Sequence, residues 1–242
     1  MRRLILTMCF LVAAPVVSAQ DEPPPPPWET SLGAGVAITS GNNDTTNFNL
    51  SFATKYDPKT IHLFKSEAVY LRGETEGERN VDRAAALVRY ERLFNERAFS
   101  FAEASYLRDP FKDIDYLISP LIGAGYHVIK TDTRRLTFDG AAGYSFESGP
   151  AGGNSDSVAV KAGESFEWSI SPTSKLTQGF FVLGKADDFG ASLYHFDAGL
   201  TTSIAARAEL KLSYLYDYRA ETPSPEIDKG DSALFAAILF KF

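Results

Sequence analysis

The chain has 242 residues, with 24 basic and 31 acidic side chains and a net charge of −7. This acidic balance argues against a nucleic-acid partner, because phosphate backbones attract basic surfaces. Cys9 is the only cysteine, so no intramolecular disulfide can form. Stability must come from other interactions.

Residues 1–19 have the order of a secretory signal peptide: a basic start, an apolar run over 4–17 and small residues at 17–19. An N-terminal membrane anchor is the alternative. The run is shorter than the roughly 20 residues that a spanning helix needs, and Pro15 interrupts it. We expect cleavage after Ala19. Loss of Arg2 and Arg3 then takes the charge from −7 to −9, and Cys9 is removed.

Residues 20–27 end in five consecutive prolines, Pro23 to Pro27. Such a run is a stiff, extended spacer without a fold of its own. A ligand for a proline-binding module is the alternative. The folded part is expected to start near Trp28, and residues 28–242 suffice for one large all-β domain.

From Trp28 onward, apolar and polar residues alternate in runs of about ten, which is the pattern of strands with one apolar face. In the first run, Leu32, Val36 and Ile38 alternate with Gly33 and Gly35. The predicted strands are 28–40, 45–56, 61–72, 81–93, 98–108, 116–128, 135–147, 156–170, 174–184, 191–204, 208–219 and 232–242.

Two runs break the pattern. Glu103 falls on the same face as Phe99 and Phe101, which predicts a β-bulge in that run. Glu164 raises the same question in residues 156–170.

The connections also alternate in length. Short turns are expected at 57–60, 94–97, 129–134, 171–173 and 205–207, and mostly longer loops at 73–80, 109–115, 148–155 and 221–231, with 41–44 as a short exception. An even strand number with short turns at one end is typical of bacterial outer-membrane barrels. We therefore predict a closed antiparallel transmembrane β-barrel of about twelve strands, with both termini in the periplasm.

A soluble lipocalin-like barrel would alternate in the same way, with its apolar face inside. Two features favour an apolar exterior. The residues opposite the apolar face are small or charged, and aromatic residues such as Trp28, Tyr56, Tyr126 and Trp168 gather near strand ends, where membrane interfaces lie. The predicted location is the outer membrane of a Gram-negative bacterium, in contact with its lipid and lipopolysaccharide.

The chain ends in a strand-like segment whose last residue is Phe242. A final strand that pairs with the first would close the barrel and leave no free edge. The segment resembles the C-terminal signal that the outer-membrane barrel assembly machinery recognises. Phe240 and Phe242 match its last two apolar positions, whereas Ala237 and Phe235 replace its usual glycine and polar residue.

Residues 28–50, with Ser40-Gly41-Asn42 and Thr45-Thr46, resemble the opening of the salt-induced outer-membrane proteins, a family of domains of unknown function. Residues 106–109 and 123–126 resemble its central region. The resemblance implies an outer-membrane barrel linked to osmotic or envelope stress. It implies no catalytic residues, because the family has no established chemistry.

The sequence offers little else in the way of chemistry. His62, His127 and His195 are far apart in sequence, which does not suggest a metal site. His195 and Asp197 share a strand face, and we interpret them as a structural pair. Residues 41–44 are better explained as a tight turn than as a calcium loop. We expect no cofactor, no metal and no enzyme activity, with a barrel hydrolase as the less favoured alternative.

The alternation predicts a narrow, charge-balanced lumen and a structural or envelope-stress role, with a small-solute pore as the alternative. Six basic and six acidic side chains are assigned to the lumen. They are Lys65, Arg83, Arg89, Lys161, Lys211 and Arg219, and Glu67, Glu91, Asp139, Glu167, Asp197 and Asp217.

Overall fold

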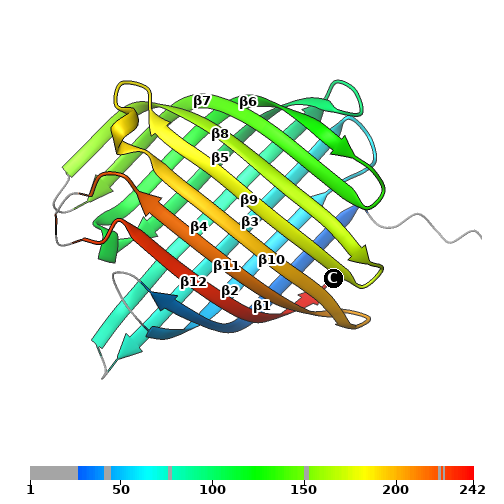
Figure 1. Cartoon of the computed structure of the whole chain (residues 1–242), viewed down its shortest axis with the longest axis horizontal. Coiled ribbons are helices and arrows are strands. Elements are labelled where there is room, and N and C mark those ends of the chain that lie inside the picture. The colour runs from blue at the N-terminus through cyan, green and yellow to red at the C-terminus, as the bar shows by residue number, and fades with distance from the viewer. Residues whose placement is uncertain (1–26, 41–44, 76–77, 150–152, 223–224, 226) are drawn as a thin grey trace, which may run out of the picture.

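The computed structural model describes residues 27–40, 45–75, 78–149, 153–222, 225 and 227–242. Within them, twelve antiparallel strands close into a barrel in which β1 pairs with both β2 and β12 (Figure 1). The predicted fold class is confirmed. The signal peptide assigned to residues 1–19 and the spacer assigned to 20–27 lie outside the described residues, apart from Pro27.

The strands follow the predicted order, and two short 3₁₀ helices lie in the connections. The strands are β1 (Trp28–Ser40), β2 (Thr45–Tyr56), β3 (His62–Thr75), β4 (Glu78–Leu93), β5 (Ala98–Asp109), β6 (Ile114–Lys130), β7 (Arg134–Gly149), β8 (Gly153–Ser171), β9 (Ser174–Lys185), β10 (Leu193–Ala205), β11 (Ala208–Arg219) and β12 (Gly230–Lys241). The 3₁₀ helices are η1 (Pro110–Lys112) and η2 (Phe189–Ala191).

Several strands extend past their predicted ends toward the long loops. β8 begins at Gly153 instead of residue 156, because its backbone pairing with β7 continues to Gly149↔Gly153. Ladder hydrogen bonds need no alternating side chains, so the apolar pattern underestimates strand length. β10 is shorter than predicted at its start, because η2 occupies part of the preceding segment.

The register puts the apolar residues of most strands on the outer face. Val36, Ile38 and Leu234 are more than half exposed, whereas the inward-facing Ala37 and Leu71 are buried. Because side chains alternate across a strand, this pattern gives the barrel an apolar exterior and a lumen lined by the other set. None of the helices in the described part of the chain is long and apolar enough to cross a membrane.

β5 departs from this rule, and the bulge predicted beside Glu103 is wrong. The pairing of β5 with β4 and β6 continues without interruption through this region, so Phe99, Phe101 and Glu103 all face the lumen. The neighbouring strand β6 makes room for the rings with Gly123 and Gly125. A Cβ at Gly125 would lie 2.2 Å from the ring of Phe99.

Glu164 also belongs to a regular stretch of strand. It pairs with Phe138 of β7 and Phe180 of β9, both exposed on the outer face. Gln178 on β9 donates a hydrogen bond to the Glu164 carboxylate at 2.5 Å. The register is continuous here, so Glu164 lies on the apolar exterior with this amide as its partner.

The two ends of the barrel differ. The connections after β2, β4, β6, β8 and β10 lie at one end, here called the short-turn end (Figure 1). The other connections lie at the loop end, and the longest of them follow β9 and β11, whereas β3–β4 and β7–β8 are linked by only residues 76–77 and 150–152. β1 starts and β12 finishes at the short-turn end, and the backbone N–H of Phe242 donates to the carbonyl of Thr30 at 3.0 Å. The last residue is therefore held by the first strand.

Candidate functional site in the barrel lumen

A central charge cluster surrounds Arg89 on β4. Its guanidinium contacts the carboxylates of Glu91 at 2.8 Å, Glu103 at 2.9 Å and Asp139 at 2.9 Å. Lys161 of β8 contacts Glu103 at 2.6 Å. These five residues connect β4, β5, β7 and β8 through the lumen, and Arg89, Glu91 and Glu103 are buried.

Arginine suits the centre of this cluster because its planar guanidinium carries five N–H donors. The group also lies over the ring of Phe101, with 3.6 Å between the guanidinium carbon and the ring centroid. Lys65 adds a further contact of 3.2 Å to Glu91. Buried charges are tolerated when each has a partner and its hydrogen bonds are made, as they are here.

A second group, the loop-end cluster, crosses the lumen closer to the long loops. Arg83 of β4 pairs with Asp217 of β11, although β3, β2, β1 and β12 separate these strands around the wall. Asp217 also contacts Nδ1 of His195 at 2.6 Å. Further pairs cross the lumen beside them. They are Lys112–Asp231, at 2.5 Å, and Arg219–Glu147.

Apolar side chains pack inside the same half of the barrel. Leu71, Val81 and Phe235, with Ala37 and Ala233, form a buried cluster on β1, β3, β4 and β12. All five lie in the parts of these strands nearest the loop end. The loop half of the lumen therefore combines cross-lumen ion pairs with core-like packing.

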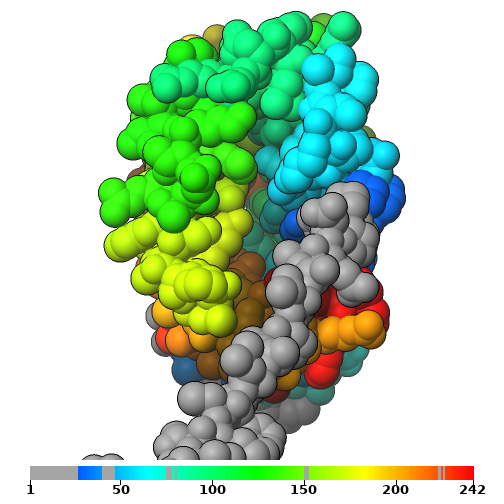
Figure 2. Space-filling model, turned by 90° about the vertical axis from the view of Figure 1, so that its right-hand side faces the viewer, coloured from blue at the N-terminus to red at the C-terminus, as the bar shows by residue number. Residues whose placement is uncertain are grey.

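The short-turn half is more open. The lumen-facing residues Ser165 and Lys175 are exposed there, whereas Ser119 and Asp217 near the loop end are buried. Figure 2 looks onto the short-turn end and shows a hollow framed by the green and yellow-green turns on one side and the cyan wall on the other. A cavity of about 50 Å³ remains at the loop end, lined in part by Arg83, Asp217 and Arg219.

The structure distributes the twelve predicted lumen residues over both clusters and the open half. Lys65, Arg89, Glu91, Asp139 and Lys161 lie in or against the central charge cluster, and Arg83, Asp217 and Arg219 lie in the loop-end cluster.

The other four predicted residues lie apart from these clusters. Glu167 contacts Lys175 at 2.7 Å near the short-turn end. Glu67 is exposed in the middle of β3, opposite Ala53 and Leu87. Asp197 lies 3.7 Å from His195. Lys211 lies on β11 opposite Thr201 and Ala237.

Four residues of these clusters were missed by the sequence reasoning: Glu103, Lys112, Glu147 and Asp231. For Glu103 the signal was present, because it shares a face with two phenylalanines. The alternation was interpreted as an irregularity instead of an inverted strand. For Lys112 and Asp231, which lie at or near loops, no periodic pattern was available.

The histidines have structural partners. His195 makes its shorter contact with Asp217 and not with Asp197, and its ring stacks on Phe181 at 4.8 Å. Two serines near this region are also hydrogen-bonded: Ser192 donates to the carbonyl of Phe189 and Ser203 to the carboxylate of Glu209. Among the described residues, no group of three or more His, Cys, Asp or Glu side chains could hold a metal ion.

A closed barrel with an apolar exterior and a charged lumen is the fold of porin-like outer-membrane proteins. Residues 32–242 match the family described as protein of unknown function, DUF481, and the chain belongs to this family. That description assigns no function, so the salt-induced designation stays a prediction. No curated protein matches the chain.

Solved structures with a similar fold include porins, a channel and the translocator domain of an autotransporter. The NanC porin aligns with a TM-score of 0.59 at 10% identity, covering 87% of this chain and all of that one. The KdgM porin, solved in complex with disordered oligogalacturonate, aligns with a TM-score of 0.52 at 8% identity, covering 88% and 99% of the chains. An outer-membrane channel from Pseudomonas putida F1 aligns with a TM-score of 0.52 at 10% identity, covering 94% and 100%. At these identities the likeness concerns the fold alone.

Proposed function

We propose that this chain is an integral barrel of the Gram-negative outer membrane that is closed in its loop half, conducts poorly at rest and has a structural or envelope-stress role. The observation that carries the proposal is the cross-lumen pairing of Arg83 with Asp217, backed by the apolar cluster around Leu71 and Phe235. In a wide pore, such as the porins of 16–18 strands, the lumen is a water-filled channel.

The charge pattern supports the same conclusion. A selective pore is often lined by charges of one dominant sign. In this lumen the charges alternate in sign, and Arg89 alone neutralises parts of three carboxylates. A passing ion would have to displace these partners from buried positions, which is costly.

Planar-bilayer recording of the purified, folded protein tests the proposal. We expect long silent intervals without stable openings. Stable, ion-selective openings from the unmodified protein would instead establish the porin alternative. Heat-modifiable migration on a gel gives the fraction of folded barrel in each preparation, so that silence is not mistaken for absence of folded protein.

A gated small-solute pore is the second candidate, and a specific observation favours it. The lumen is hollow at the short-turn end (Figure 2), and side chains such as Arg83 and Asp217 cross the loop half. In the Asp217→Ala variant, openings that the parent lacks would show that this cluster closes a path. Glu67→Ala is the matched control, because Glu67 faces the lumen outside the loop-end cluster and is already exposed.

The proposal includes an orientation, with both termini in the periplasm and the long loops outside the cell. An epitope tag inserted beside Pro225, between β11 and β12, should be accessible to antibody on intact cells. A tag inserted at Pro172, in the turn between β8 and β9, is the control and should be accessible only after permeabilisation. If the Pro172 tag were accessible on intact cells and the Pro225 tag only after permeabilisation, the barrel would have the reverse orientation.

A further inference from the structure

A large apolar groove runs over the outer face of the barrel, on the side formed by β1 to β5. Its volume is about 540 Å³, within the range of small-molecule sites. We call it the outer groove. Its lining residues on the outer face are Leu32, Ala34, Leu50, Phe52, Ala68, Tyr70, Ala84, Ala86, Tyr106 and Phe240.

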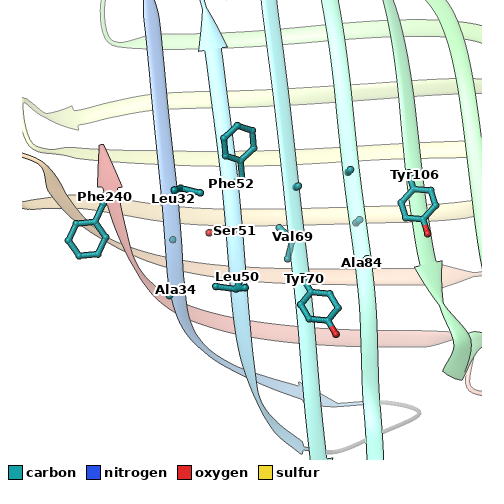
Figure 3. Close-up of a pocket in the computed structure, with 14 residues that line it drawn as sticks. Leu32, Ala34, Leu50, Ser51, Phe52, Val69, Tyr70, Ala84, Tyr106 and Phe240 are labelled. Atoms are coloured by element: carbon teal, nitrogen blue, oxygen red, sulfur yellow. The ribbon is translucent and has the colours of Figure 1, made fainter. Parts of the chain in front are cut away.

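The register explains the shape of the outer groove. Phe52, Ala68, Ala86 and Tyr106 follow one another across β2, β3, β4 and β5 as direct cross-strand neighbours. Two small side chains therefore lie between two aromatic walls (Figure 3). The next row toward the loop end is Leu50, Tyr70, Ala84 and Arg108, so Ala84 continues the groove floor between a tyrosine and an arginine. A depression of this kind on an apolar exterior is shaped for a flexible hydrocarbon chain.

The loop end of the outer groove is polar. The hydroxyl groups of Tyr70 and Tyr106 both point toward the loop end (Figure 3), as aromatic rings at a membrane interface do. Arg108 pairs with Ala84 on the groove floor, and Arg72 pairs with Asp82 one row beyond. A guanidinium cluster thus begins where the apolar groove stops.

Three arginines share two carboxylates at this position. Asp82 accepts from Arg108 at 3.0 Å, from Arg79 at 3.1 Å and from Tyr70 at 3.2 Å. Arg72 pairs with Glu74 at 2.7 Å. Each guanidinium has five N–H groups and retains donors for a further anion, and Asp115 is a further carboxylate that acts on Arg108. Arg72, Arg79 and Arg108 all remain well exposed.

We propose that the outer groove binds an acyl chain of a phosphorylated, multiply acylated glycolipid, the chemistry of the lipid A part of lipopolysaccharide, with its phosphates on Arg72 and Arg108. Guanidinium groups bind phosphate oxygens through paired hydrogen bonds. Arginines spread over β3 to β5 can engage more than one phosphate. The site rests on the membrane location and outward loops proposed above.

A second copy of the chain fits this surface less well. Pairing two copies through the outer groove would bring the exposed guanidiniums of both copies to the rim of one interface, and like charges placed together oppose association. A neutral phospholipid would fill the groove but would leave the exposed guanidiniums without an anion.

Native mass spectrometry of the folded, delipidated full barrel with added lipid tests the assignment. Diphosphorylated hexa-acyl lipid A should remain bound at least fivefold more than its dephosphorylated form or phosphatidylcholine. Arg72→Gln should reduce its retention severalfold. Ala68→Leu with Ala86→Leu, which fills the groove floor without touching an arginine, should reduce retention of all acyl lipids. Arg92→Gln is the control, because Arg92 lies exposed on β4 at the short-turn end.

Equal retention by the parent and the Arg72→Gln variant would overturn the site. Equal retention of lipid A and its dephosphorylated form by the parent protein would also contradict the proposed site. Preference for phosphatidylglycerol over lipid A would replace the glycolipid by a phospholipid and so contradict the proposal. None of these outcomes depends on conductance, so a failed lipid site and a failed closed-barrel proposal can be told apart.

Discussion

At the scale of single residues, Arg89 does most to hold the lumen walls together. Its three carboxylate partners come from β4, β5 and β7, and two of them, Glu91 and Glu103, are buried. Without the guanidinium, these acids would face one another with only Lys65 and Lys161 nearby. Removing one member of a buried charge group leaves uncompensated charge behind.

Arg89→Met should therefore destabilise the folded barrel by about 3–5 kcal/mol, the usual cost of breaking a buried ion pair. Urea unfolding in lipid vesicles, followed by loss of heat-modifiable migration, measures the change. Arg92→Met on the same strand is the control, because that side chain is exposed on the outer face. A difference within error between the two variants would show that the central charge cluster does not contribute to stability.

Glu164 shows the opposite situation, a carboxylate on the apolar exterior. Acidic residues facing lipid destabilise barrels by an amount that depends on depth, smaller than the ~2–4 kcal/mol of Arg or Lys at the midplane. Glu164→Gln should stabilise the folded barrel by about 1 kcal/mol, because it removes the charge and keeps an acceptor for Gln178. The same unfolding assay applies, with the exposed lumen residue Glu67→Gln as control. Destabilisation by Glu164→Gln would instead show that a group in the membrane stabilises the ionised carboxylate.

At the scale of elements, β5 and β6 form an inverted pair. Phe99 and Phe101 of β5 point inward. The residues that pair with them on β6 are the glycines Gly125 and Gly123. Their role is steric, since a Cβ at Gly123 would lie 2.7 Å from the ring of Phe101 and 2.2 Å from the carbonyl oxygen of Gly140.

Gly125→Ala should destabilise the barrel by about 1–3 kcal/mol, the cost of overpacking a filled interior. The added Cβ would lie 2.2 Å from the Phe99 ring. In a Phe99→Ala background the same substitution should cost much less, and the double-mutant cycle isolates the clash. Gly140→Ala is the control, because its Cβ would meet only a carbonyl oxygen at 3.8 Å. Additive effects would place the strain elsewhere.

At the scale of the whole molecule, closure depends on the seam between β1 and β12. The pairing runs from Ser31↔Lys241 to Ser40↔Ser232, so nearly the whole of both strands takes part. Closure removes the free strand edges, which would otherwise leave backbone groups unpaired in lipid. The seam is tight around Gly35, where a Cβ would lie 1.9 Å from the carbonyl oxygen of Ala236.

Gly35→Val should therefore prevent closure and abolish the heat-modifiable form, because the added side chain meets backbone that cannot move aside. Comparing boiled and unboiled protein on a gel measures this directly. Ala34→Val, one residue away and on the outer face, should leave the shift intact. A normal shift in Gly35→Val would show that the seam can widen without loss of the barrel.

The sequence by itself determined the strand number, the strand order and the side of the sheet that faces outward. The strand number follows from local alternation, whereas the outward side also required the small and charged residues opposite the apolar face and the aromatic residues near strand ends. The predicted pairing of the last strand with the first is confirmed by the ladder between β1 and β12.

Tertiary structure alone decided which lumen charges meet. Arg83 and Asp217 lie on strands separated by four others, and Arg89 reaches Asp139 across the interior. Local periodicity therefore does not predict either pair. The inward direction of Phe99 likewise depended on glycines of a neighbouring strand. The outer groove arises because small residues of β3 and β4 come into register between aromatic residues of β2 and β5. Alternation fixes the face on which each side chain lies, but barrel closure and strand register fix its neighbours.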